Sequence, residues 1–120
     1  MIHACRLPRL IAALTLCALP IQAWAASPTV QCAAFWAGWV EVSGSSTFLP
    51  KDPADAALAE AFAVAARAEN RAEAEQHLAR DSADMARMIR AAIQGDGTSI
   101  GLMDRLMRGC EEAARKRGLL

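Results

Sequence analysis

Residues that favour strands, or that carry most enzyme chemistry, are scarce in this chain of 120 residues. β-Branched side chains are few and never alternate with polar ones, as they would in a half-buried strand. Of the two histidines, only His77 lies outside the first 25 residues. Nothing in the sequence places a histidine beside a free thiol or with a serine and an aspartate. We therefore expect an all-α, non-catalytic protein with no cofactor.

An excess of positive charge is also absent. The chain has 13 basic and 13 acidic residues, and without Arg6 and Arg9 the remainder has 11 basic against 13 acidic. A protein that binds a polyanion needs a basic surface to attract it. The charge balance therefore disfavours nucleic acid as a partner.

Residues 1–25 have the three parts of a secretory signal peptide. Arg6 and Arg9 supply the positive charge, residues 10–19 are almost wholly apolar, and residues 23–25 form the A-x-A cleavage box Ala-Trp-Ala. We predict cleavage after this box. The remaining residues, 26–120, would form one domain in the periplasm or outside the cell, with no membrane attachment.

Two other interpretations of this leader are weaker. An uncleaved anchor needs about 20 apolar residues to span a bilayer, and the apolar run is shorter than that. A lipoprotein would be modified at Cys17, but the preceding residue, Leu16, is not small.

Cys32 and Cys110 are the only cysteines that follow the predicted leader. An even pair in an exported protein favours a disulfide. In the chain-entropy model, closing so long a loop stabilises the fold by roughly 4 kcal/mol. We predict a structural cross-link and not a redox-active pair.

The segment 31–40 contains three of the six aromatic residues of the chain. Its large apolar residues have the i, i+3, i+4, i+7, i+8 spacing of one helix face: Cys32, Phe35, Trp36, Trp39 and Val40. We predict that this segment is the central helix of the core.

The remaining helices follow from their start and stop signals. Asp52-Pro53 opens one helix, and Gly95-Asp96-Gly97 ends the helix before the last. Asp81-Ser82 could cap a separate third helix, or the helix could pass straight through it. We expect Thr98 or Ser99 to cap the last helix, in which Glu111 would pair with Arg115. The predicted fold is an antiparallel bundle of three to four helices, at about 30–42, 53–80, 82–94 and 99–117.

Two segments between these signals carry further expectations. In the loop 43–51 at least one of Phe48 and Leu49 should reach the core, because a loop does not usually expose both. Residues 67–81 are highly polar, which predicts a solvated and protruding helix end.

The aromatic residues Phe35, Trp36, Trp39 and Phe48 are the candidate contacts with a ligand or partner. They could line a ligand groove or enclose a cation. Helical spacing favours a plain core role for them, so this hypothesis is the less economical one.

Two motifs resemble metal sites. Glu73, His77 and Asp81 share one helix face, but a solvated polar face explains them better than a weak transition-metal site. Residues 95–99 match part of a calcium loop without its closing glutamate. We predict no metal site.

Four features together resemble a family of small exported helical proteins of proteobacteria with no assigned activity. They are Cys32 with the aromatic residues after it, the Phe48-Leu49-Pro50 loop, Gly95-Asp96 and the late Cys110. The resemblance implies export, an all-helical fold and one cysteine pair, and it implies no site residues. The chain is more loosely similar to small periplasmic acid-stress chaperones.

The sequence thus leads to a first hypothesis and two alternatives. The first is a non-catalytic periplasmic binding or interaction protein, whose partner the sequence does not identify. The alternatives are an enzyme or metal-handling protein that uses His77 with its neighbouring carboxylates, and a small stress chaperone.

Overall fold

The computed structural model describes residues 26–120, so the predicted signal peptide lies outside the described residues. The described chain forms four helices and no strand: α4 (Pro28–Ser45), α5 (Pro53–Glu69), α6 (Arg71–Ile93) and α7 (Gly97–Lys116). The predicted all-α bundle is confirmed. None of these helices is both long enough and apolar enough to cross a membrane.

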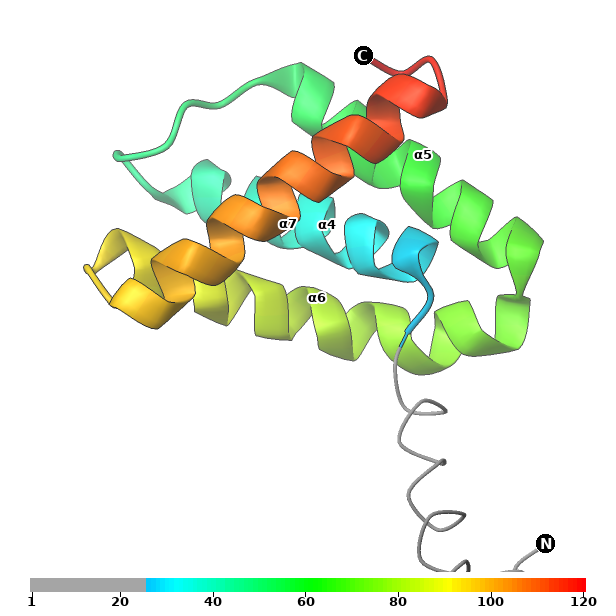
Figure 1. The fold of residues 1–120 in the computed structure, drawn as a ribbon, viewed down its shortest axis with the longest axis horizontal. Coiled ribbons are helices and arrows are strands. Elements are labelled where there is room, and N and C mark those ends of the chain that lie inside the picture. The colour runs from blue at the N-terminus through cyan, green and yellow to red at the C-terminus, as the bar shows by residue number, and fades with distance from the viewer. Residues whose placement is uncertain (1–25) are drawn as a thin grey trace, which may run out of the picture.

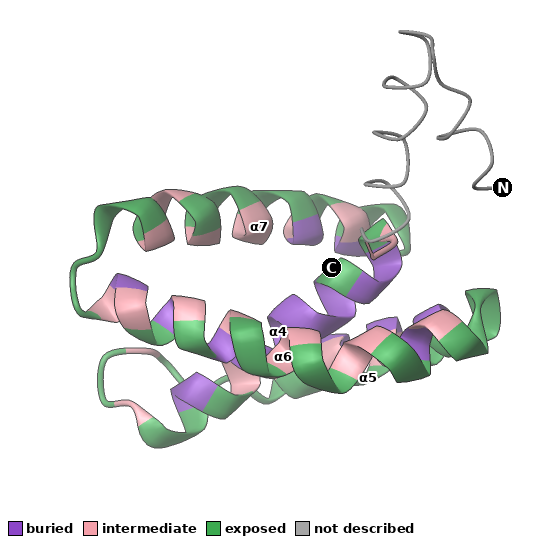
Figure 2. Ribbon diagram, turned by 90° about the horizontal axis from the view of Figure 1, so that it is seen from below, coloured by how far each residue is buried: buried purple, intermediate pink, exposed green. Residues whose placement is uncertain are grey.

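Helix α4 is the centre of the bundle, as predicted. It lies between α5 and α6, and α7 runs across them as a second layer (Figures 1 and 2). Ten of its 18 residues are buried, including every residue from Cys32 to Trp36. A run of five consecutive buried residues exceeds one helical turn. The single apolar stripe inferred from the sequence therefore understates how completely α4 is enclosed.

Close approach between α4 and α6 depends on Gly38. A Cβ atom at this position would lie 2.9 Å from both the backbone nitrogen of Ala86 and the Cβ of Met85. Any side chain would therefore push the two helices apart. Gly38 is buried in α4, and Ala86 is one of the buried residues of α6.

The bounds predicted for the second and third helices are wrong, and of the two possibilities at Asp81-Ser82 the helix that passes straight through is the one found. The chain passes helically through Asp81-Ser82, where Ser82 Oγ donates to the carbonyl oxygen of Leu78 at 2.7 Å. The break falls at Asn70, whose backbone is extended and whose side chain accepts a hydrogen bond from the Glu73 nitrogen at 3.1 Å. Asn70 ends α5 and caps α6, because its short amide can replace a helical hydrogen bond.

Because of this break, the polar segment 67–81 does not protrude as one solvated helix, contrary to the expectation. It turns at Asn70 and returns along α4. Ala74 is fully buried and packs with Val30 and Ala66 in a small apolar cluster. The segment is polar because only one narrow face of it is buried.

Other helix ends agree better with the sequence. Ser27 caps α4 by accepting from the Val30 nitrogen, and Asp52 caps α5 with Pro53 as its first residue. The predicted cap of the last helix is wrong, because Asp96 takes that role and accepts from the nitrogen and the hydroxyl of Ser99. Gly118 follows α7 with φ +73°, a conformation that favours glycine.

The turn at residues 94–96 brings α7 back antiparallel to α6, as predicted (Figure 1). Apolar side chains of both helices join the main core, in which Ile89 is fully buried and the others are partly buried: Met88, Ile93, Met103, Leu106 and Met107. Leu49 from the loop also packs on this core, while Phe48 is 78% exposed. One of the two loop side chains therefore reaches the core, as expected.

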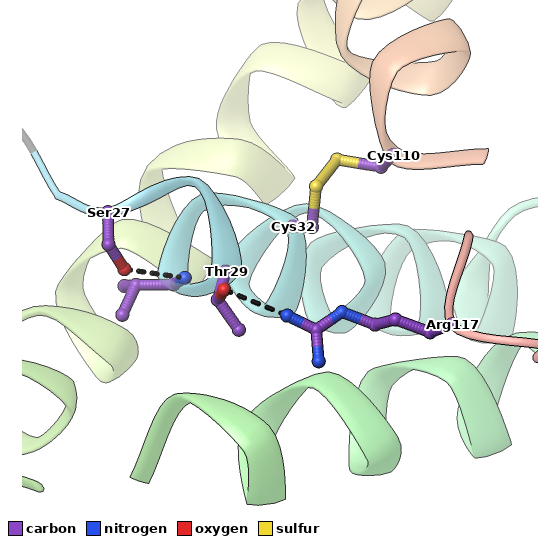
Figure 3. The surroundings of a disulfide bond; sticks show 6 residues. Ser27, Thr29, Cys32, Cys110 and Arg117 are labelled. Atoms are coloured by element: carbon purple, nitrogen blue, oxygen red, sulfur yellow. Dashed lines mark hydrogen bonds between the residues drawn. A yellow bond between two sulfur atoms is a disulfide. The ribbon is translucent and has the colours of Figure 1, made fainter. Parts of the chain in front are cut away.

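The predicted disulfide joins Cys32 in α4 to Cys110 in α7, with their Cα atoms 5.4 Å apart (Figure 3). It ties α7 covalently to α4, and Cys110 is one of two buried residues, with Ala114, among the 20 of that helix.

A second contact, the Arg117 cluster, lies on another side of α4 (Figure 3). Arg117 Nη2 donates to Thr29 Oγ1 at 3.1 Å and to Glu69 Oε2 at 3.2 Å. The Thr29 hydroxyl itself donates to Glu69 Oε2 at 3.0 Å. The guanidinium carbon also lies 5.3 Å from the ring centre of Phe62. The cluster links the start of α4, the end of α5 and the segment after α7.

Candidate ligand-binding site

A cavity of about 330 Å³ lies where α4, the start of α5 and α7 meet. Such a volume is at the small end of the range for ligand pockets. We call it the Trp–acid cavity because its wall combines two tryptophans with three carboxylates, apolar residues and Pro50: Trp36, Trp39, Pro50, Asp52, Ala54, Asp55, Leu58, Met107, Glu111 and Leu120.

Trp39 and Asp55 connect the two sides of this wall. The indole nitrogen of Trp39 in α4 donates to Asp55 Oδ2 in α5 at 3.2 Å. Trp39 faces the cavity because it sits one turn after Trp36 in the same helix. Asp55 is placed in the first turn of α5 by the cap at Asp52, where the helix dipole favours negative charge.

The carboxylates of the cavity have no cationic partner in the described part of the chain. None of Asp52, Asp55 and Glu111 takes part in the ion pairs formed there. Partial burial raises the pKa of Asp55 above its ordinary value of 3.8. The negative charges of Asp52 and Glu111 add to this increase, and the hydrogen bond from Trp39 opposes it. The cavity therefore carries uncompensated negative charge.

These carboxylates do not form a metal centre. Nowhere in residues 26–120 do three or more His, Cys, Asp or Glu side chains group closely enough to hold a metal ion. The carboxylates instead lie apart along a wall whose other members are mainly apolar. The arrangement suits an occupant that extends past several of them.

The four aromatic candidates fall into three environments. Trp36 and Trp39 line the Trp–acid cavity. Phe35 is fully buried, and its ring centre lies 5.3 Å from that of Trp36 and 6.1 Å from that of Trp39. Phe48 lines a separate cavity of about 310 Å³ with Arg90 and other residues. The structure thus brings two of the four together at one site, with Phe35 supporting them from the core.

The indole nitrogen of Trp36 lacks a hydrogen-bond partner among the described residues. The residue is 2% exposed, and its buried indole nitrogen finds no hydrogen-bond acceptor in the described part of the chain. Leaving such a donor unpaired costs about 1–3 kcal/mol. Unpaired buried groups are rare and call for a specific explanation, such as a bound water or ion.

His77 does not belong to the Trp–acid cavity. Its side chain is only 12% exposed, so the expected fully solvated position is wrong. Its Nδ1 lies 3.0 Å from Arg80 Nη2 and 3.8 Å from Asp81 Oδ2. Glu73 instead accepts a hydrogen bond from the backbone nitrogen of Ser27. Of the three residues of the suggested metal face, His77 and Asp81 therefore lie beside each other, while Glu73 is engaged with Ser27.

The sequence interpretation missed the carboxylates of the site. It treated Asp52 and Asp55 as helix-start signals, which they also are. It assigned Glu111 as the partner of Arg115, but Arg115 pairs with Glu112 at 3.4 Å. One sequence signal could have indicated these carboxylates. Glu111 follows a cysteine of the predicted disulfide, and Asp52 and Asp55 lie at the start of a helix.

Comparison of the chain with protein-family models, curated proteins and solved structures found no match. The interpretation of the site therefore depends on its own geometry.

Proposed function

We propose that this protein is a non-catalytic, exported binding protein and that the Trp–acid cavity is its ligand site. The observation that carries the proposal is the meeting of Trp36 and Trp39 with carboxylates that have no cationic partner within residues 26–120. Charged groups held without partners in a partly apolar cavity cost stability. Such sites are commonly retained for function.

The composition of the wall supports binding over catalysis. The residues that line the cavity include no serine, threonine, cysteine, histidine or lysine. Apart from the carboxylates and the two indole N–H groups, the wall is apolar. Flat aromatic faces beside carboxylates are suited to recognising a cation with an apolar body.

The disulfide supports the exported location, because disulfides persist in oxidising compartments. Mass spectrometry of protein isolated from the periplasm should give a mature chain that begins at Ala26 and lacks two hydrogen atoms because of the Cys32–Cys110 bond. An intact Met1, a lipid on Cys17 or two free thiols would contradict this part of the proposal.

Binding can be tested through the indole N–H groups of the cavity. In ¹⁵N-labelled oxidised protein, Trp39 reports its hydrogen bond to Asp55. A set of small cationic, neutral and anionic compounds should include some that shift the Trp39 indole signal in a saturable way. No saturable shift from any class at millimolar concentration would reject the cavity as a ligand site.

A further inference from the structure

We propose that the Trp–acid cavity selects a primary ammonium group carried on a short apolar stem. This inference rests on the proposed binding function and adds the chemical class of the ligand.

The hydrogen-bonding capacity of the wall is almost entirely accepting. Asp52 Oδ1 accepts from the Ala54 nitrogen, and Asp55 Oδ2 accepts from Trp39. The second oxygen of each aspartate and both oxygens of Glu111 receive no hydrogen bond from the described residues. A ligand must therefore bring donors, and an ammonium group brings three together with a positive charge.

The apolar part of the wall sets the requirement for a stem. Trp36, Trp39, Leu58 and Met107 come from three different helices and all line the same cavity. An alkyl chain can pack along such a surface while its charged head stays with the carboxylates, as lysine side chains do. The indole faces also favour a cation near them.

An inorganic ion fits the same wall poorly. The carboxylates are too dispersed to act as one ligand set, as the absence of any metal-binding group in residues 26–120 indicates. Strongly hydrated divalent ions would also gain little from the tryptophans. Trp36 lines the same wall, although its own N–H is buried and unpaired within the described residues.

The test uses the exported, disulfide-bonded protein and four probes of similar size or charge: n-butylammonium, 1-butanol, butyrate and Mg²⁺. Titrations follow the Trp39 indole signal. Butylammonium should give a saturable shift, while butanol and butyrate should bind at least about tenfold more weakly. Added salt should weaken butylammonium binding, since the attraction is partly screened.

Variants then assign the effect to the wall. Glu111→Gln and Asp55→Asn should each weaken butylammonium about fivefold, as expected for the loss of one partly exposed ion pair. Glu60→Gln removes one charge from the exposed side of α5 and should change the affinity less than about twofold. Thermal unfolding of each variant confirms that it is folded.

The outcomes separate the two proposals. Equal binding of butanol and butylammonium would keep the ligand site but overturn the ammonium preference. Displacement of butylammonium by equimolar Mg²⁺, or equal losses in Glu60→Gln and Glu111→Gln, would overturn it as well. No shift with any probe would overturn both proposals. A blocked Gly-Lys-Gly peptide, titrated in parallel, tells whether the ammonium group comes from a free amine or from a protein lysine.

Discussion

The two ends of α5 each present a carboxylate to the rest of the bundle, and the two carboxylates have different partners. Glu69, the last residue of α5, receives hydrogen bonds from Arg117 and Thr29. Asp55, in its first turn, receives only the indole N–H of Trp39 and has other carboxylates around it. Asp55 is the more buried of the two, yet it is the one without a cationic partner among the described residues.

The difference separates a structural cluster from the cluster that we propose binds a ligand. In the Arg117 cluster the guanidinium and the Thr29 hydroxyl both donate to Glu69, and the charges of Arg117 and Glu69 cancel without a ligand. In the Trp–acid cavity the acceptors outnumber the donors and the negative charges add. A cation from outside the chain would complete the second cluster as Arg117 completes the first.

The largest expected effect comes from the disulfide, because α7 contributes Glu111 to one cluster and leads directly to Arg117 in the other. The double variant Cys32→Ser/Cys110→Ser should lose about 4 kcal/mol of unfolding free energy through the larger entropy of its unfolded chain. For a domain of this size that lowers Tm by roughly 15 °C or more. Reductant should have the same effect on the natural protein and none on the variant. A change in Tm below about 3 °C would show that α7 is held by its packing alone.

The next largest effect should come from disrupting the close contact between α4 and α6, because α4 contributes residues to both clusters. Gly38→Ala should destabilise the protein by about 1–3 kcal/mol, since its methyl group would overlap Met85 and Ala86. Gly109→Ala is the matched control, because a Cβ there meets no atom within 4 Å. It should stabilise α7 by about 0.5–1 kcal/mol. Denaturant unfolding measures both, and equal effects would disprove the close approach.

Substitutions in the two clusters should change the stability of the protein in opposite directions. Arg117→Ala should cost about 1 kcal/mol, from a partly exposed ion pair and the contact with Phe62. Asp55→Asn should leave stability unchanged or slightly raise it, because the amide oxygen can still accept from Trp39 while the repulsion disappears. If Asp55→Asn proves the more damaging of the two in thermal unfolding at pH 7, Asp55 is structural.

The smallest effect is a dependence on pH. Because the pKa of Asp55 is raised in the folded state above 3.8, folding favours its protonated form. Stability should therefore fall as pH rises from about 3.8 through the raised pKa. The groups around it are the carboxylates of Asp52 and Glu111 and the Trp39 N–H, with no cation facing it among the residues that line the cavity. The stability of Asp55→Asn relative to the natural protein should increase over this range.

Asp96 provides the control of opposite sign. Hydrogen bonds from the side chain and the backbone of Ser99 lower its pKa below 3.8. The stability that Asp96 contributes is present above 3.8 and is lost as pH falls through the lowered pKa. Asp96→Asn should therefore be less stable than the natural protein by a constant amount above pH 3.8, and this difference should shrink as the pH falls below 3.8. If the stability of Asp55→Asn and that of the natural protein changed in parallel between pH 4 and 7, the raised pKa of Asp55 would be contradicted.

Most of the fold could be predicted because its signals are local. Asp52-Pro53 and Gly95 mark helix boundaries by chemistry that acts over a few residues, and the cysteine pair follows from counting. The break at Asn70 could not, because a single asparagine between strong helix formers is compatible with either a helix or a cap. The choice is made by the fit of Ala74 against Val30 and Ala66, which is a tertiary contact.

The site was half predictable for the same reason. Trp36 and Trp39 are neighbours on one helix face, so helical spacing brings them together. Asp55 and Glu111 join them only because α5 and α7 cross α4 at particular angles, which no local pattern records. Phe48 was grouped with the tryptophans on residue type alone, and the structure places it at a different cavity.

The bond between Cys32 and Cys110 closes a covalent ring that contains the whole of α5 and α6. The exposed stretch around Phe48 and Lys51 lies inside that ring. A protease that cuts there would yield two peptides that stay linked, with both walls of the cavity still tied to each other. A single nick in this stretch therefore need not release either half of the molecule.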